Sequence, residues 1–117
     1  DGCRTPLDLA LLLDGSGSIE MPQYGGAPGN FQNRVLGFAK ALVPFFNYGP
    51  LNNHTRMAVT TFASSGSTGV NFHLNAHTDA ASLLSAIDTI SYPRGGTATS
   101  VGINRIRTQV FTEANGM

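Results

Sequence analysis

Three oxygen-bearing side chains follow an apolar run near the start of the chain. In the segment LDLALLLDGSGS, Asp14 ends the apolar run, and Ser16 and Ser18 follow at alternate positions. Gly15 and Gly17 separate them, and glycine lets a turn curl tightly enough for alternate side chains to converge. One carboxylate and two hydroxyls are hard oxygen ligands, which suit Mg²⁺, Ca²⁺ or Mn²⁺. The segment therefore predicts a divalent-cation site, and the alternative is a solvated turn after a strand.

Other motifs that place small or acidic residues on a turn do not fit this segment. An EF-hand loop that begins at Asp14 would need glycine at its sixth position and glutamate at its twelfth, where the chain has Ile19 and Gly25. A phosphate-binding P-loop ends in Gly-Lys-Ser/Thr, and no lysine is near. A nucleophile elbow needs G-x-S-x-G, and the glycines around Ser16 are too close together.

Three segments have the composition of β-strands. Residues 7 to 14 are almost wholly apolar, which suits a strand buried on both faces, and we expect it to be the central strand. Residues 56 to 62 and 70 to 74 alternate in character, and the short glycine-rich link between them predicts an antiparallel hairpin. Asp14 would then lie at the carboxyl end of the first strand, where open α/β sheets bind ligands.

Three helices are expected between and after the strands. Apolar residues recur at helical spacing over residues 31 to 46, with Asn30 as the N-cap and Pro44 disturbing the last turn. Asp79 is expected to cap a second helix, and a third ends near residue 111. The apolar residues expected on the helix faces or in the core are Val35, Phe38, Ala39, Leu42, Phe45, Phe46, Phe62, Phe72, Leu83, Leu84, Ile87, Val101, Ile103, Ile106 and Val110.

The order of these elements predicts the fold class. Strand, helix, strand, strand, helix, helix indicates an α/β protein with a doubly wound, mostly parallel sheet and one antiparallel edge strand. Three strands with helices on both faces would leave the central strand with an unpaired edge. We therefore expect residues 1–117 to be one partial domain, truncated after the third helix.

Several polar residues near these elements have a structural alternative to a functional role. Thr99 and Ser100 could support the cation site, but we favour a role as caps of the third helix. Glu20 is expected to be solvated. Tyr92 and Arg94 border a glycine-rich loop and are candidates for contacting a partner, with exposed loop filler as the alternative. His73 and His77 are four residues apart, a spacing that does not bring side chains together from a strand, so we expect no histidine metal site.

The order of motifs resembles the von Willebrand factor type A domain, whose metal-ion-dependent adhesion site opens with D-x-S-x-S. That family adds a threonine from a Gly-Gly-Thr loop, and Gly95-Gly96-Thr97 stands about 80 residues after the first motif. The resemblance covers essentially the whole chain. It implies that Asp14, Ser16, Ser18 and Thr97 bind Mg²⁺, or Mn²⁺ or Ca²⁺. The family also uses an aspartate after a later strand, which the chain does not reach, so the resemblance implies an N-terminal portion with an incomplete site.

The resemblance implies a binding module and no enzyme. A partner protein's Asp or Glu would complete the coordination shell of the cation. A structural matrix module with a vestigial metal site is the alternative. A Mg²⁺-dependent phosphatase of the haloacid-dehalogenase type is less favoured, because it needs a second aspartate where the chain has Ser16. Within the family, the chain looks most like apicomplexan adhesins of the thrombospondin-related anonymous protein type, with invertebrate matrix and collagen-associated members as alternatives.

Composition restricts the partners and the location. The chain is 41% hydrophobic and 12% charged, which is typical of a globular domain, and its formal net charge is zero. The sequence contains no basic stripe of the kind that binds nucleic acids, and no apolar run approaches the roughly 18 residues of a membrane span. Cys3 is either a free thiol or half of a disulfide, and we expect a disulfide to a cysteine beyond Met117. Asn53-His54-Thr55 matches a glycosylation acceptor. These features favour an extracellular or cell-surface location.

Overall fold

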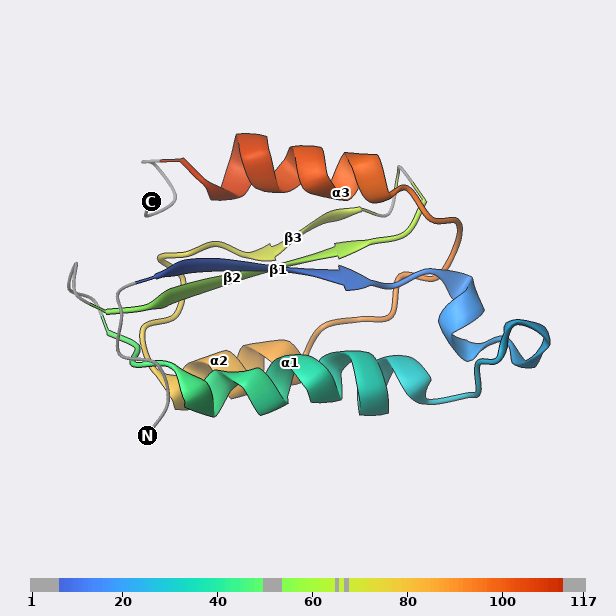
Figure 1. Ribbon diagram of the computed structural model, residues 1–117, viewed down its shortest axis with the longest axis horizontal. Coiled ribbons are helices and arrows are strands. Elements are labelled where there is room, and N and C mark those ends of the chain that lie inside the picture. Colours follow the sequence, from blue (N-terminus) through green and yellow to red (C-terminus); the bar gives the residue numbers. More distant parts are fainter. Residues whose placement is uncertain (1–6, 50–53, 65, 67, 113–117) are drawn as a thin grey trace.

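A mixed three-stranded sheet forms the middle layer of the molecule (Figure 1). The computed structural model describes residues 7–49, 54–64, 66 and 68–112. Strands β1 (Asp8–Asp14) and β2 (Arg56–Phe62) run parallel, with Asp8 opposite Arg56 and Asp14 opposite Phe62. Strand β3 (Gly69–Phe72) pairs antiparallel with β2, with a bulge between Val59 and Thr60. The α/β class, the hairpin and the antiparallel edge strand are thus confirmed.

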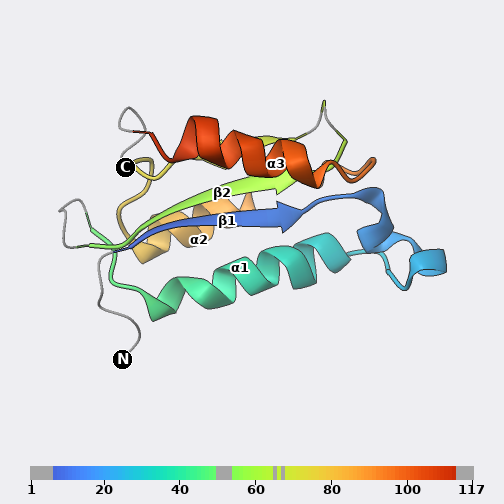
Figure 2. The same cartoon turned by 45° about the horizontal axis from the view of Figure 1, so that its top comes forward.

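The expectation that residues 7 to 14 form the central strand is wrong for the described part of the chain. The strand order is β1-β2-β3, so β2 lies in the middle. All residues of β2 after Arg56 are buried, whereas β1 mixes buried and half-buried residues. Helices cover both faces of β1, which accounts for its apolar character (Figures 1 and 2). The strand expected at residues 70 to 74 ends early, at Phe72, although Leu74 beyond it is fully buried.

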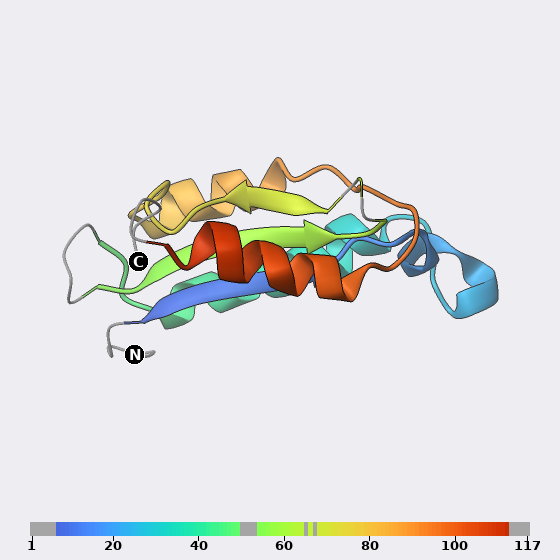
Figure 3. The same ribbon diagram turned by 90° about the horizontal axis from the view of Figure 1, so that it is seen from above.

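Helices cover the sheet on both faces (Figures 1 and 2). On one face lie α1 (Leu36–Leu42), which a π turn precedes and a 3-10 turn with Pro44 follows, and α2 (Ala80–Asp88). On the other face α3 (Thr99–Arg105) continues into a π turn and lies along the sheet, as Figure 3 shows from above. The core therefore has two parts, one under α1 and α2 and a smaller one under α3.

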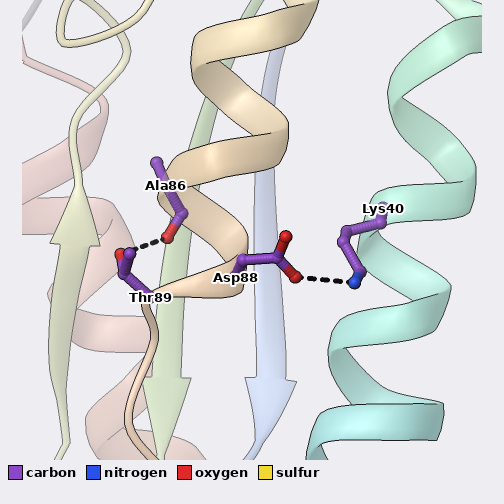
Figure 4. Close-up of polar contacts among 4 residues, drawn as sticks. All are labelled: Lys40, Ala86, Asp88 and Thr89. Atoms are coloured by element: carbon purple, nitrogen blue, oxygen red, sulfur yellow. Dashed lines mark hydrogen bonds and ion pairs between the residues drawn. The ribbon is translucent and has the colours of Figure 1, made fainter.

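One ion pair joins the two helices of the first face (Figure 4). Lys40 Nζ of α1 lies 2.6 Å from Asp88 Oδ1 at the end of α2. Next to it, the Thr89 hydroxyl donates to the Ala86 carbonyl at 2.8 Å, which satisfies one of the free carbonyls at the end of α2. Both charged groups are partly exposed, so the pair contributes at most about 1 kcal/mol.

The helix starts differ from expectation at two of three places. Asp79 caps α2 as predicted, because its Oδ1 accepts from the Ser82 amide at 2.8 Å. Asn30 stands at the predicted N-cap position but does not cap: its backbone is already helical, and its side chain donates to the Ile19 carbonyl at 3.2 Å. The N-cap residue of α3 is Ala98 and has no capping side chain, so the expected caps Thr99 and Ser100 are wrong and lie inside the helix.

The buried face of α1 is also shifted from the expected one. Leu36, Ala39 and Val43 are fully buried, whereas Phe38 and Phe45 are each 58% exposed. The three buried residues keep regular helical spacing, so the helix buries a face about one residue round from the expected one, and the expected Val35 and Leu42 lie half-buried at its border. Ile103 of α3 is likewise 57% exposed, against expectation, while Leu83, Ile87, Val110, Phe62 and Phe72 are buried as predicted.

Two helical glycines test how closely the helices approach the sheet. A Cβ at Gly102 of α3 would lie 2.8 Å from Leu12 Cδ1 and 3.0 Å from Phe62 Cβ, whereas a Cβ at Gly37 of α1 would meet nothing within 4 Å. We expect Gly102→Ala to cost about 1–3 kcal/mol of unfolding free energy, because the sheet must yield. Gly37→Ala should instead stabilise by about 0.5–1 kcal/mol. Urea denaturation checks both, and equal effects of the two changes would contradict the packing described here.

Candidate metal centre

Asp14 stands at the carboxyl end of β1, where the chain turns away from the sheet (Figure 1). The Gly15 amide donates to the Phe62 carbonyl at 2.8 Å and extends the β1–β2 pairing by one residue. The Asp14 carboxylate is half-buried, and its Oδ1 accepts from the Ser16 amide at 2.9 Å. This hydrogen bond fixes the carboxylate over the turn that follows it.

The two serine hydroxyls converge on this turn. A 3-10 turn over Gly17–Glu20 brings Ser18 back toward Ser16, and the two Oγ atoms lie 3.1 Å apart. Ser16 is only 1% exposed, whereas Ser18 is half-buried. The structure therefore brings the Ser16 and Ser18 hydroxyls together, and it holds the Asp14 carboxylate beside them through the Ser16 amide.

A second loop, which carries Thr97, lies against the first. The Gly17 amide donates to the Gly95 carbonyl at 2.9 Å, and the Ala98 amide donates to the Ala63 carbonyl at 2.7 Å. Thr97 lies between these two anchors and is exposed. Among the described residues, no hydrogen bond joins its side chain to those of Asp14 or the two serines. The loop is thus placed at the same edge of the sheet, with the Thr97 hydroxyl free to turn toward a ligand.

The first glycine of the turn is needed for space and not for a left-handed backbone. A Cβ at Gly15 would lie 2.4 Å from Pro93 Cγ and 2.7 Å from Pro93 Cδ. Neither Gly15 nor Gly17 has a positive φ. In the loop that carries Thr97, Arg94 and Gly95 have positive φ values. Gly15 therefore lets Pro93 of the second loop press against the end of β1.

Tyr92 clamps the two loops together, a role that the sequence analysis missed. Its hydroxyl lies 2.7 Å from the Ser16 carbonyl and 3.0 Å from the Gly17 carbonyl, and donates to them. Its ring stacks on Phe31 with 4.9 Å between the ring centroids. Burial raises the pKa of the Tyr92 phenol above its usual 10, and the Glu20 carboxylate raises it further. The signal in the sequence is a single tyrosine just before the Gly-Gly-Thr loop, which spacing alone cannot connect to Ser16.

Glu20, expected to be solvated, has a structural partner. Its Oε2 accepts from the Phe31 amide at 3.2 Å, at the start of the helix that follows the long loop. A carboxylate at that position satisfies a free helical amide and interacts favourably with the helix dipole. Glu20 is therefore committed to the helix start and is not placed among the cation ligands.

Removing the Tyr92 hydroxyl should loosen the clamp. We expect Tyr92→Phe to cost about 1–2 kcal/mol of unfolding free energy, since two carbonyls of the turn lose their donor. Tyr48→Phe is the matched control, because the buried Tyr48 hydroxyl has no hydrogen-bond partner among the described residues. It should cost nothing or stabilise.

The same two tyrosines predict an alkaline loss of stability. Burial raises the pKa of Tyr48 to about 12, and that of Tyr92 is also raised. The folded state therefore holds its phenolic protons more tightly than the unfolded chain. This contribution is full below pH 10 and is lost as the pH rises toward 12. Urea denaturation from pH 8 upward should show a decline that is smaller in each Tyr→Phe variant; an unchanged decline in both would contradict this assignment.

The donor set fits a hard divalent cation. Within the described residues no group of three or more His, Cys, Asp or Glu side chains gathers, so the turn offers one carboxylate with neutral hydroxyls. Soft metals prefer thiolate or imidazole, and Mg²⁺, Mn²⁺ and Ca²⁺ prefer oxygen. Because Asp14 is the only anionic group of the set, a bound cation would keep most of its charge.

Two sequence predictions lie outside the described residues. They are the disulfide of Cys3 and the glycosylation of Asn53, and both stay predictions. In the ranges that are described, no helix combines the length and apolar character needed to cross a bilayer.

Comparisons with known proteins agree on one family. The family model described as von Willebrand factor type A domain matches residues 8–117. Human Matrilin-1 is 32% identical over 115 residues, which are 97% of this chain and 21% of that protein. Chicken Integrin alpha-1 is 32% identical over 117 residues, which are 97% of this chain and 35% of that protein. The chain thus spans about a fifth to a third of the length of these relatives.

A solved structure gives the same result in three dimensions. The proximal thread matrix protein 1 from the mussel byssus, with a zinc-occupied MIDAS motif, has a TM-score of 0.80 and 31% identity. The match covers 94% of this chain and 26% of that one. The matrilins, integrin alpha and this matrix protein are non-enzymatic adhesion or matrix modules, which agrees with the prediction of a binding module. The finer likeness to apicomplexan adhesins stays a prediction.

Proposed function

We propose, because the chain belongs to the von Willebrand factor type A domain family, that it is an extracellular adhesion or matrix module that binds an acidic side chain of a protein partner through a divalent cation. The observation that carries the proposal is the convergence of Asp14, Ser16 and Ser18 on one turn. The hydrogen bond from Gly17 to Gly95 supports it further, since it fastens the Thr97 loop beside that turn.

Each residue would have a distinct part in the site. Asp14 supplies the negative charge that attracts the cation, and the Ser16 amide keeps its carboxylate in place. Ser16 and Ser18 supply neutral oxygens, and Thr97 stands exposed on the facing loop as a fourth ligand. A bound cation would supply a Lewis-acidic position for an incoming carboxylate. Because one carboxylate does not neutralise a divalent cation, these residues leave it attractive to the Asp or Glu of a partner.

We assign the site to Mg²⁺, with Mn²⁺ or Ca²⁺ as alternatives, because its side chains offer oxygen alone. The zinc-occupied MIDAS of the mussel matrix protein supports a divalent cation at the corresponding motif without naming the physiological one. A structural matrix module with a vestigial metal site remains the second candidate function. The names of the matrilin and byssus-matrix relatives favour its matrix role, whereas the zinc-occupied MIDAS of the byssus protein speaks against a vestigial site.

Metal dependence separates these two functions. The intact protein is titrated with Mg²⁺, Mn²⁺, Ca²⁺ and Zn²⁺ in a calorimeter. Its binding to an immobilised peptide with one Glu among glycines is then measured with each cation and with EDTA. We expect binding that EDTA removes and Mg²⁺ restores. Binding that is indifferent to EDTA would favour the structural module.

A further inference from the structure

We propose that Arg94 forms a second acid-binding position beside the cation site, so that the preferred partner segment presents two carboxylates. This inference rests on the proposed function, because the first carboxylate is the one that the cation would bind. Arg94 is exposed and directly precedes Gly95, whose carbonyl accepts the hydrogen bond from Gly17. The Arg94 guanidinium is thus carried by the residue next to the Gly17–Gly95 hydrogen bond that joins the two loops.

An aromatic ring that is itself fixed to the metal loop supports this guanidinium. The Arg94 Cζ atom lies 5.2 Å from the centroid of the Tyr92 ring. Tyr92 is held in turn by its stacking on Phe31 and by its hydrogen bonds to the Ser16 and Gly17 carbonyls. A guanidinium that rests on a fixed ring is pre-organised, so it loses less freedom when it binds a carboxylate.

The backbone at Arg94 points to a use for its side chain. Within the described ranges, Arg94 is the only residue other than glycine with a positive φ, at 60°. Glycine or asparagine would adopt this left-handed conformation at lower cost. Backbone strain of this kind gathers at ligand-binding sites. The turn alone does not require an arginine, whereas a partner's acid would.

The charges around Arg94 leave it available for a partner. Lys40 and Arg56 form ion pairs with Asp88 and Asp8, whereas Arg94 has no carboxylate partner in the part of the chain that the structure describes. Its side chain borders a hollow of about 430 Å³ beside the metal loop, lined by Gly17, Glu20, Met21, Tyr92, Arg94 and Gly95.

The one acid of this hollow, Glu20, does not cancel the position. Its carboxylate already accepts the Phe31 amide, and a partner's acid that enters the hollow deeply would meet a like group there. The second carboxylate of the partner is therefore directed to the exposed side of the hollow, where Arg94 lies.

The test compares peptides with one and two acids on the intact protein. One peptide carries a single Glu among glycines, and a series adds a second Glu one to four residues further along. Fluorescence anisotropy reports binding with Mg²⁺ and with EDTA. We expect at least one diacidic peptide to bind about threefold to tenfold more tightly than the monoacidic one in Mg²⁺.

Variants at Arg94 then assign the preference. Arg94→Gly should remove it without lowering the thermal stability, because glycine relieves the positive φ. Arg94→Asn, which tolerates the same backbone with less flexibility, should do likewise. Arg94→Lys should keep part of the preference, since it retains the charge without the planar fork.

Two results would overturn the inference. A preference for two acids that survives both Arg94→Gly and Arg94→Asn would overturn it, and so would the absence of any preference in the wild-type protein, while metal-dependent binding stands. The loss of metal dependence for every peptide in the wild-type protein would instead overturn the proposed function, and this inference with it.

Discussion

Asp14→Ala is expected to abolish the divalent-dependent binding of an acidic ligand, with a loss of at least about 100-fold in affinity. The change removes the only carboxylate among the four proposed ligands, and with it the main attraction for the cation. The fold should survive, because Asp14 is half-buried at the end of a strand and belongs to neither core cluster.

Matched variants separate charge from shape at this position. Asp14→Asn keeps an oxygen that can accept from the Ser16 amide and removes only the charge, so it should lose as much binding as Asp14→Ala. Ser16→Ala and Ser18→Ala should each weaken binding by only about tenfold, since water can partly replace a neutral hydroxyl. Thermal unfolding serves as the folding control. Binding that tolerates both Asp14 variants would leave the structural matrix module as the function.

The cation turn could be foreseen because its geometry is local. Asp14, Ser16 and Ser18 lie within five consecutive residues, so their convergence depends on one turn after one strand. The strand β2 and the antiparallel hairpin were equally local, since a short link joins their two runs. The placement of Thr97 needed the family resemblance, because no sequence spacing connects two loops about 80 residues apart.

What the sequence did not reveal depends on contacts between distant elements. The order of the strands depends on which strands pair with each other. Apolar content alone cannot distinguish a strand that pairs on both edges from one that helices cover on both faces. Phe38 and Phe45 are exposed because α1 buries Leu36, Ala39 and Val43 instead, and the helix is apolar enough that its spacing fits either face. The clamp formed by Tyr92 depends on Ser16, which lies 76 residues away.

Phe31→Ala is expected to have the largest effect on stability, about 3–5 kcal/mol of unfolding free energy. The Phe31 side chain is 1% exposed and belongs to the core cluster under α1 and α2. Its ring also stacks on Tyr92, so the change removes core packing and the support of the loop clamp together. A loss of this size is a large part of the 5–15 kcal/mol that stabilises a typical domain.

The control for this change is Phe38→Ala, in α1, the helix that directly follows the π turn of Phe31. Phe38 is 58% exposed, and its removal should cost less than about 0.5 kcal/mol. Urea denaturation of the intact protein gives both values, and calorimetry with Mg²⁺ shows whether the loss of Phe31 also weakens the cation site. If the two changes cost the same, the shifted helix face described here is wrong. If Phe31→Ala leaves both the free energy of unfolding and the Mg²⁺ affinity unchanged, then the Phe31–Tyr92 stack does not connect the core to the cation turn.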